Sequence, residues 1–243
     1  MRTYSQIAEV AQARVPEFSA LCKDITYEEK GVLYSEILFM LVCMGEPPAR
    51  ILESGRARGQ STLLLARALP KSEILSVEYN PNSPDVLVAE ERLRPYGNAS
   101  LLFGDARKVL PTLLDKEAVA IIDGPKMFRA VRLALRLLAS GRVRQVYIHD
   151  VNVETPERAF LLKFLPECMY SDNREVAEVT HVLDSHAADR LPENRKLTGF
   201  TGPFGYGFGL ACIPYSETRN YRYLVVMAGL YDLVGRIRKK LRL

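Results

Sequence analysis

The stretch Arg50-Ile-Leu-Glu-Ser-Gly-Arg-Ala-Arg-Gly-Gln-Ser-Thr62 combines an apolar strand end, a turn with two glycines and the start of a helix. The apolar run ends at Glu53. Gly55 and Gly59 then permit backbone geometry, or a close approach of another segment, that a Cβ atom would obstruct. The stretch therefore predicts a tight passage from a buried strand into a helix.

The helix after this turn has recognisable signals at both ends. Ser61 or Thr62 is placed to cap its start, and Pro70 follows its last apolar residue. Free N–H groups at the start of a helix beside a glycine turn form a site for a polar or anionic ligand group. An ordinary strand-to-helix turn gives the same local pattern, so this stretch alone leaves both interpretations open.

Composition indicates a globular protein with one large core. The chain has 243 residues, of which 48% are hydrophobic and 26% charged, and its net charge is +4. One domain with terminal additions is expected at this length. Four widely separated cysteines without a CxxC pair favour reduced, buried thiols in a cytoplasmic protein over disulfides or a zinc site. The N-terminus has no apolar stretch typical of a signal peptide.

Short apolar runs alternate with helical patterns over the middle of the chain. The predicted strands end near Leu52, Glu78, Phe103, Ile122 and Ile148, and the helices between them run through 61–69, 84–94, 109–114 and 129–139. This alternation predicts an α/β fold, a Rossmann-like doubly wound sheet that is mostly parallel, with an antiparallel edge strand and helices on both faces.

An acidic residue follows each of these five strands at its carboxyl end. The five residues are Glu53, Glu78, Asp105, Asp123 and Asp150. Ligands of open α/β sheets bind at this end of the strands. Any one of the acids could instead cap a helix, but five at equivalent positions indicate a ligand site.

The remaining segments are assigned by pattern alone. Residues 5–15 and 27–44 are predicted helices within an N-terminal region, 1–48, that belongs to the same domain as the α/β part, 49–215. Strands at 178–183 and 210–213 are expected to form the antiparallel edge, with a polar connection at 184–196. The glycine- and aromatic-rich run 199–209 is either a substrate lid or an ordinary loop.

Two common phosphate-binding patterns are absent. A nicotinamide-binding turn requires G-x-G-x-x-G, whereas Ala57 occupies the place of the middle glycine here. No G-x-x-x-x-G-K-[ST] motif occurs either. A nucleoside without a pyrophosphate fits better, because Glu78 can accept two hydrogen bonds from a ribose diol and Asp105 can lie near an adenine amino group.

The ordered motifs resemble those of class I S-adenosylmethionine-dependent methyltransferases, most closely the catechol-type, metal-dependent O-methyltransferases and their bacterial relatives. The resemblance covers residues 49–152 and rests on Glu53-x-Gly55-x-x-x-Gly59-x-Ser61, Ser76-Val-Glu78-Tyr-Asn-Pro81, Gly104-Asp105 and Ile122-Asp123-Gly-Pro-Lys126. It implies that S-adenosylmethionine is the cofactor. The cofactor residues it implies are Glu53, Gly55, Gly59, Ser61, Glu78 and Asp105.

The resemblance also assigns the reaction to the ends of the fourth and fifth strands. It implies that Asp123 binds Mg²⁺, that Lys126 is the base toward a substrate hydroxyl, and that Asp150 completes the metal site. The family has an asparagine directly after the second aspartate; here Val151 stands there, with Asn152 one place further. The metal ligands expected are thus Asp123, Asp150 and Asn152, while His149 is read as a packed histidine.

Asp123-Gly-Pro-Lys126 lacks the aromatic residue that holds a planar amine in nucleic-acid N-methyltransferases, so no nucleic-acid partner is expected. The segment 216–243 is apolar and ends in a basic cluster. It is either a final element packed in the core or a homodimer interface, or an amphipathic helix on the inner membrane face. Localisation is therefore expected to be cytoplasmic, with peripheral membrane contact through this segment as the alternative.

The sequence supports two functions of different classes. One is O-methylation of a small molecule or sugar, assisted by Mg²⁺. The other is a non-catalytic nucleoside-binding member of the same fold that acts as a membrane-associated or partner-binding protein. Arg56 and Arg58 motivate the second, because two cations beside a sulfonium are unfavourable unless they point away or pair with acids.

Overall fold

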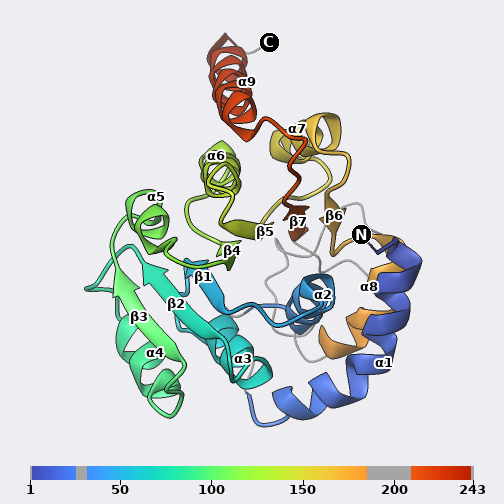
Figure 1. Ribbon diagram of the computed structural model, residues 1–243, viewed down its shortest axis with the longest axis vertical. Coiled ribbons are helices and arrows are strands. Elements are labelled where there is room, and N and C mark those ends of the chain that lie inside the picture. Colours follow the sequence, from blue (N-terminus) through green and yellow to red (C-terminus); the bar gives the residue numbers. More distant parts are fainter. Residues whose placement is uncertain (1, 26–31, 185–208, 242–243) are drawn as a thin grey trace.

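A seven-stranded sheet forms the centre of the molecule (Figure 1). The structure is a computed structural model, and it describes residues 2–25, 32–184 and 209–241. The sheet order is β3-β2-β1-β4-β5-β7-β6. The strands are β1 (Arg50–Ser54), β2 (Glu73–Glu78), β3 (Ala99–Phe103), β4 (Ala118–Ile122), β5 (Val143–Ile148), β6 (Met169–Tyr170) and β7 (Ala211–Pro214).

Strands β1 to β5 pair in parallel, and β7 is antiparallel to both of its neighbours, β5 and β6. This confirms the predicted doubly wound, mostly parallel sheet with an antiparallel edge region. The helices are α1 (Tyr4–Cys22), α2 (Tyr34–Met44), α3 (Gln60–Ala68), α4 (Asp85–Leu93), α5 (Ala106–Val109), α6 (Phe128–Leu138), α7 (Pro156–Phe164), α8 (Arg174–Thr180) and α9 (Tyr221–Leu241), with 3₁₀ turns at Leu110–Leu113 and His181–Asp184.

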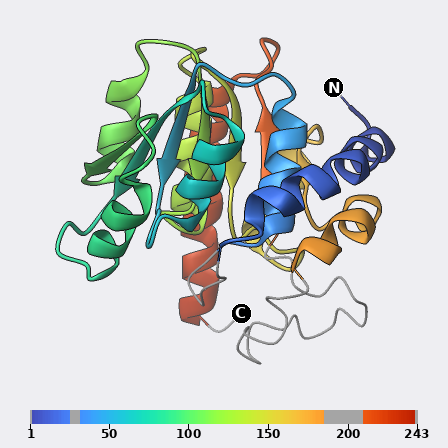
Figure 2. The same cartoon turned by 90° about the horizontal axis from the view of Figure 1, so that it is seen from below.

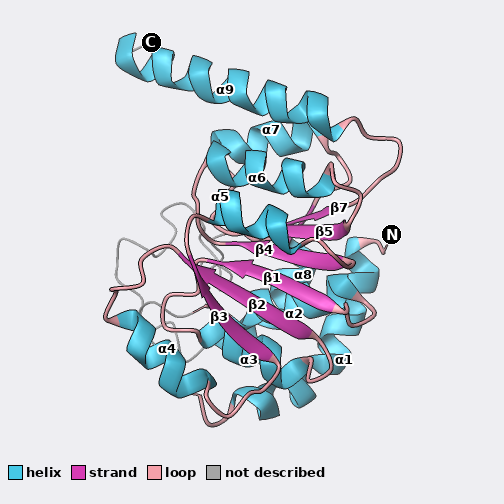
Figure 3. Cartoon of the chain, turned by 60° about the vertical axis from the view of Figure 1, so that its left-hand side comes forward, coloured by secondary structure: helices cyan, strands magenta, loops and turns pink. Residues whose placement is uncertain are grey.

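Helices cover both faces of the sheet (Figure 3). One core contains side chains of α6, α7 and α9, and the other contains side chains of α1, α2 and α3. Adjacent strand residues serve opposite cores, since Ile51 belongs to the second and Leu52 to the first. Because both faces are covered, the strands read as continuous apolar runs.

The N-terminal helices are part of this packing. Seen from below, α1 and α8 lie side by side although they are far apart in the sequence (Figure 2). The Tyr4 hydroxyl accepts a hydrogen bond from the N–H of Tyr170, at 3.0 Å. Residues 27–31 of the predicted second helix lie outside the described residues, residues 32–33 are not helical, and Tyr34–Met44 form α2.

The predicted strand at 178–183 is wrong. These residues belong to α8 and the following 3₁₀ turn, and β6 takes the expected place beside β7. Asn173 explains the difference, since its side chain accepts a hydrogen bond from the N–H of Glu175 and caps α8. Most of the predicted polar connection, and the run 199–208, lie outside the described residues.

The loops after β1 and β4 meet where the sheet order reverses. Gly55 has φ of +83°, and a Cβ there would lie 2.8 Å from the carbonyl carbon of Asp123 and from the nitrogen of Gly124. Real Cβ atoms do not approach backbone so closely, so only glycine fits without displacing a loop. Ligands of doubly wound sheets bind at such a reversal point.

A buried carboxylate fixes the start of α2 from a distant part of the chain. Asp184 Oδ1 accepts hydrogen bonds from the N–H groups of Tyr34 and Ser35, at 2.7 and 3.2 Å. It therefore caps α2, whose own preceding residue, Leu33, offers no capping side chain. Burial raises the pKa of Asp184 to about 7, outweighing these two donors.

We predict that Gly55→Ala lowers the free energy of unfolding by at least about 2 kcal/mol, because it combines a left-handed φ with a backbone clash. Urea unfolding measures this loss. Gly97→Ala is the matched control, since nothing lies within 4 Å of a Cβ there. Equal stability of both variants would contradict the close approach.

We also predict a pH dependence that originates at Asp184. The pKa of Asp184 is higher in the folded chain than in the unfolded one. Its contribution to the stability of the fold is therefore complete below about pH 4 and is lost as the pH rises to about 7. Asp184→Asn imitates the protonated acid and should remove a difference on the order of 3 kcal/mol between pH 4 and pH 8. If the free energy of unfolding changes with pH in the same way in the wild type and in Asp184→Asn, Asp184 is not the origin of the pH dependence.

Candidate functional site

The turn after β1 delivers the chain directly into α3. Gly59 has φ of +73° and is the residue that precedes the helix, and its N–H donates to the carbonyl of Arg56 at 2.7 Å. No side chain caps this helix. The prediction that Ser61 or Thr62 is the cap is therefore wrong, because both hydroxyls bind elsewhere.

Glu53 is the acceptor that engages these hydroxyls. Its carboxylate is 2% exposed and accepts hydrogen bonds from Ser61 at 2.5 Å, from Ser76 at 2.6 Å, and from Thr62. A buried carboxylate needs such donors to offset the loss of water. Glu53 is thus locked in one orientation beneath the turn, with Ser61 joined to it.

Arg56 is buried, and its guanidinium binds the two neighbouring strands. Its Nη1 donates to the carbonyls of Ser76 at 2.6 Å and Leu102 at 3.1 Å, and its guanidinium lies 4.8 Å from the centre of the Phe103 ring. It therefore joins β2 to β3. Burial lowers the pKa of Arg56, and the nearby Glu53 and Glu78 charges oppose that shift.

Arg58 is paired with an acid. Its Nε donates to Asp85 Oδ1 at 2.9 Å at the start of α4. The charge of Arg58 is thus balanced by an acid, whereas Arg56 is held by backbone carbonyls, so the electrostatic objection to a cationic ligand beside the turn is removed for Arg58.

Glu78 and Asp105 both bind backbone N–H groups at the strand ends. Glu78 accepts from Ala57 at 3.2 Å and from Tyr79 at 2.7 Å, so it links the ends of β1 and β2. Asp105 caps α5 and accepts from the Arg107 guanidinium, whose proximity lowers the pKa of Asp105. The capping role weighed for each acid thus holds for Asp105, while its role near adenine remains a prediction.

The ends of β4 and β5 bring the predicted reaction residues together. Lys126 Nζ donates to Asp150 Oδ2 at 2.6 Å and to Asp123 Oδ1. His149 Nδ1 lies 3.1 Å from Asp123 Oδ1 and 3.0 Å from Asp150 Oδ1. Two carboxylates therefore face one ammonium and one imidazole.

A third carboxylate reaches this cluster from the other side of His149. His149 Nε2 lies 2.9 Å from Oε2 of Glu36, which is 1% exposed. Neither Glu36 nor the role of His149 was anticipated. The available signal was Glu36 itself, the one charged residue of the otherwise apolar segment 34–44.

The charges of the cluster reinforce one another. Burial opposes charge on His149, but the carboxylates of Glu36 and Asp123 outweigh it and raise the pKa of the imidazole. Burial likewise opposes charge on Lys126, and Asp123 and Asp150 raise its pKa. Burial opposes ionisation of both aspartates, and His149 and Lys126 lower their pKa values. The charged forms of Asp123, Lys126, His149 and Asp150 are therefore favoured by one another.

Backbone strain is concentrated in the same loops. Among the described residues, those other than glycine with positive φ are Ala57, Met127 and Asp150, with φ of 45°, 61° and 62°. They follow β1, β4 and β5. Such conformations cost about 1 to 3 kcal/mol each and cluster at functional sites.

The cluster offers a donor set for a divalent cation. One ligand atom from each of Asp123, His149 and Asp150 lies within 4.8 Å of the others. Asn152 Oδ1 is buried and has no hydrogen-bond partner among the described residues, so it is a further oxygen acceptor near the end of β5. The oxygen atoms suit Mg²⁺ or Mn²⁺, and the imidazole suits Mn²⁺ better than Mg²⁺.

A small cavity of about 60 Å³ lies between the turn and this cluster. Glu53, Gly55, Ser61, Asp123 and His149 contribute to its lining. The structure thus brings four predicted site residues, Glu53, Gly55, Ser61 and Asp123, to one cavity. Glu78 and Asp105 lie at the ends of the neighbouring strands β2 and β3.

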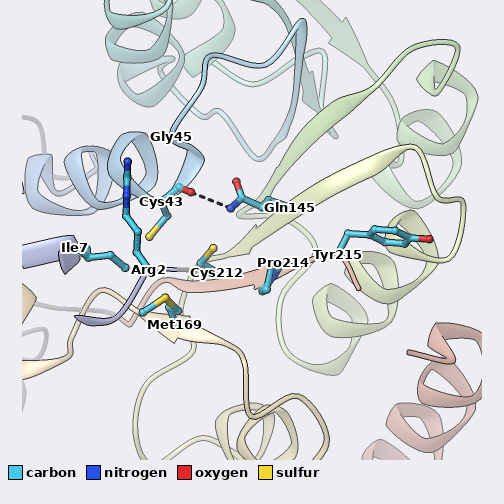
Figure 4. A pocket seen from close by; sticks show the side chains of 9 residues that line it. All are labelled: Arg2, Ile7, Cys43, Gly45, Gln145, Met169, Cys212, Pro214 and Tyr215. Atoms are coloured by element: carbon cyan, nitrogen blue, oxygen red, sulfur yellow. Dashed lines mark hydrogen bonds between the residues drawn. The ribbon is translucent and has the colours of Figure 1, made fainter. Parts of the chain in front are cut away.

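A larger cavity of about 600 Å³ lies elsewhere (Figure 4). Cys43, Gln145, Met169 and Cys212 line it, beside the end of α2 and the start of β5. This is the end of the parallel strands opposite the acids, so the larger volume does not mark the site.

Comparison with known proteins gives a consistent but partial picture. No protein-family model matches the chain. A transmembrane O-methyltransferase of Pan troglodytes is 36% identical over 101 residues, which make up 40% of this chain and 33% of that protein. The chain thus matches about a third of the length of this relative.

Solved structures of methyltransferases are similar in fold. The methyltransferase PaMTH1 of Podospora anserina, bound to SAH, has 18% identity and a TM-score of 0.46, with 85% of this chain and 88% of that chain covered. Cofactor-bound Rv0187 from MTB has 20% identity and a TM-score of 0.42, with 85% and 89% covered. At these scores the likeness adds no argument about function to the geometry above.

We predict that Lys126→Gln binds Mn²⁺ about tenfold more tightly than the wild type, because its ammonium no longer competes for the two carboxylates. Asp150→Asn should weaken binding, and Lys71→Gln, an exposed lysine distant in sequence, is the matched control. Calorimetry or the electron paramagnetic resonance signal of free Mn²⁺ measures the affinity. A Lys126→Gln protein that binds no more Mn²⁺ than the control would exclude this donor set.

Proposed function

We propose that this chain is an S-adenosylmethionine-dependent methyltransferase that acts on an oxygen of a small molecule or sugar, with assistance from a divalent cation such as Mg²⁺. One observation carries the proposal: a glycine turn at the sheet reversal point lies beside a carboxylate and lysine cluster at the ends of β4 and β5. The relative described as an O-methyltransferase supports the same reaction class.

The turn and the acids of β1 to β3 supply the cofactor site in this proposal. The methionine part lies beside Gly55 and Gly59, where Glu53 is fixed by Ser61. Glu78 binds the ribose hydroxyls, and Asp105 lies by the adenine. Arg58 is neutralised by Asp85, and the Arg56 guanidinium is held by the carbonyls of Ser76 and Leu102, which fixes where its charge lies relative to the sulfonium.

Asp123 and Asp150 would hold the cation, with Asn152 as a further ligand, or His149 once the proton on its Nδ1 has left. When bound, a divalent cation lowers the pKa of a coordinated hydroxyl and orients its oxygen. Methyl transfer forms a carbon–oxygen bond as the carbon–sulfur bond of the sulfonium breaks, and the hydroxyl proton must leave.

Lys126 is the proposed acceptor of that proton. While both carboxylates face it, Nζ keeps its own proton, since its pKa is raised. It can act as a base only when the carboxylates are engaged by another cation. The salt-bridged arrangement is therefore the resting state of the site.

The non-catalytic alternative loses part of the observation that motivated it. Arg58 is paired with Asp85, and Arg56, which contributes to the lining of the small cavity, donates to two strand carbonyls. No described feature favours a purely binding role over catalysis. We therefore retain the enzyme as the proposed function.

Calorimetric titration with S-adenosylhomocysteine tests the cofactor assignment. We predict binding by the wild type and at least about tenfold weaker binding by Glu78→Ala, which loses charge-assisted hydrogen bonds to the ribose. Glu91→Ala, an exposed acid on α4, is the control. Absence of binding by the wild type, or undiminished binding by Glu78→Ala, would reject the assignment.

A further inference from the structure

The last helix, α9, uses one side to join the body of the protein. Tyr221, Leu224 and Ala228 are buried in the core shared with α6 and α7. The Tyr231 ring also packs edge-on against Phe160, with ring centres 5.3 Å apart. Figure 3 shows α9 as the outermost element over α6 and α7, with its final turns extending beyond them.

The opposite side of α9 is also apolar, and no segment among residues 2–25, 32–184 and 209–241 covers it. Six large apolar side chains on this side are between 47% and 61% exposed: Tyr223, Val226, Leu230, Leu233, Val234 and Ile237. They recur at intervals of three and four residues, which places them on one face of the helix. We call these six residues the outer face.

The net positive charge of the protein is concentrated in the same helix. Residues 221–241 contain five basic residues and one acidic residue, a net charge of +4 that equals the net charge of the whole chain. Arg222, Arg236 and Lys240 are exposed and, by helical spacing, follow one edge of the outer face. The acid, Asp232, is already paired with Arg236, at 2.6 Å.

These charges select between two kinds of occupant. Pairing of the outer face with the outer face of a second copy would bring basic edges together without acidic residues to balance them. An anionic lipid surface instead attracts the basic residues and accepts the apolar side chains at the level of the headgroups.

Within the described residues, no helix is both long enough and apolar enough to cross a bilayer. We propose that α9 is a membrane-surface helix, which lies with its outer face on an anionic lipid bilayer while its inner face holds it to α6 and α7. The helix has 21 residues and so lies along about 30 Å of that surface. The α/β domain would thereby be held at the membrane surface.

Sedimentation with vesicles tests the proposal on the full chain. We expect the wild type to bind vesicles of phosphatidylcholine with phosphatidylglycerol at least about tenfold more strongly than vesicles of phosphatidylcholine alone. Leu230→Ser with Leu233→Ser should lower that binding at least about tenfold, and so should Arg222→Gln with Lys240→Gln. Leu87→Ser with Val88→Ser, which removes exposed apolar side chains from α4, should leave it unchanged.

All substituted residues of α9 are exposed, so each variant should keep the unfolding midpoint of the wild type. Equal binding to both vesicle types, or undiminished binding by the Leu230/Leu233 variant, would overturn the proposal. A second set of results would also overturn the proposal. In it, the wild type does not bind vesicles and is a dimer by light scattering, whereas the Leu230/Leu233 variant is a monomer. That result would assign the outer face to a second copy of the chain.

Discussion

The close approach of the loops after β1 and β4 is the constraint on which the site depends. At Gly55 the two backbones are so near that no side chain fits between them. This contact fixes the distance between the glycine turn and Asp123, and hence between the proposed cofactor end and the proposed reaction end. The parallel pairing of β1 with β4 sets the register that brings them together.

Charge compensation completes the site that this contact creates. Glu36 reaches His149 from α2, and His149 with Lys126 balances the two aspartates of β4 and β5. Burial opposes charge on His149, Lys126 and the two aspartates, and their mutual contacts outweigh it. The arrangement is thus a preformed ionic cluster, in which the proposed cation would replace Lys126 as the partner of the two carboxylates.

The sequence predicted the sheet well because its signals are local. Five apolar runs alternate with helical periods, and each ends on an acid, so strand ends and their polar residues could be placed by pattern. The helix at 174–180 was missed because its valines favour a strand while its cap, Asn173, was overlooked. The ion pair of Glu36 with His149 joins residues 113 positions apart, and no local pattern reports such a contact. The sequence shows that the charge of Arg56 is unfavourable beside a sulfonium. It does not show that Arg56 is buried between β2 and β3, because that burial depends on tertiary packing.

A crystal structure of the chain with S-adenosylhomocysteine and Mn²⁺ tests the central claim most directly. The account predicts the amino acid end of the ligand beside Gly55, its ribose on Glu78, and anomalous density between Asp123 and Asp150 with Lys126 displaced from both carboxylates. Ligand bound away from the carboxyl ends of β1 and β2, or metal absent from between the aspartates while Lys126 keeps both contacts, would contradict it.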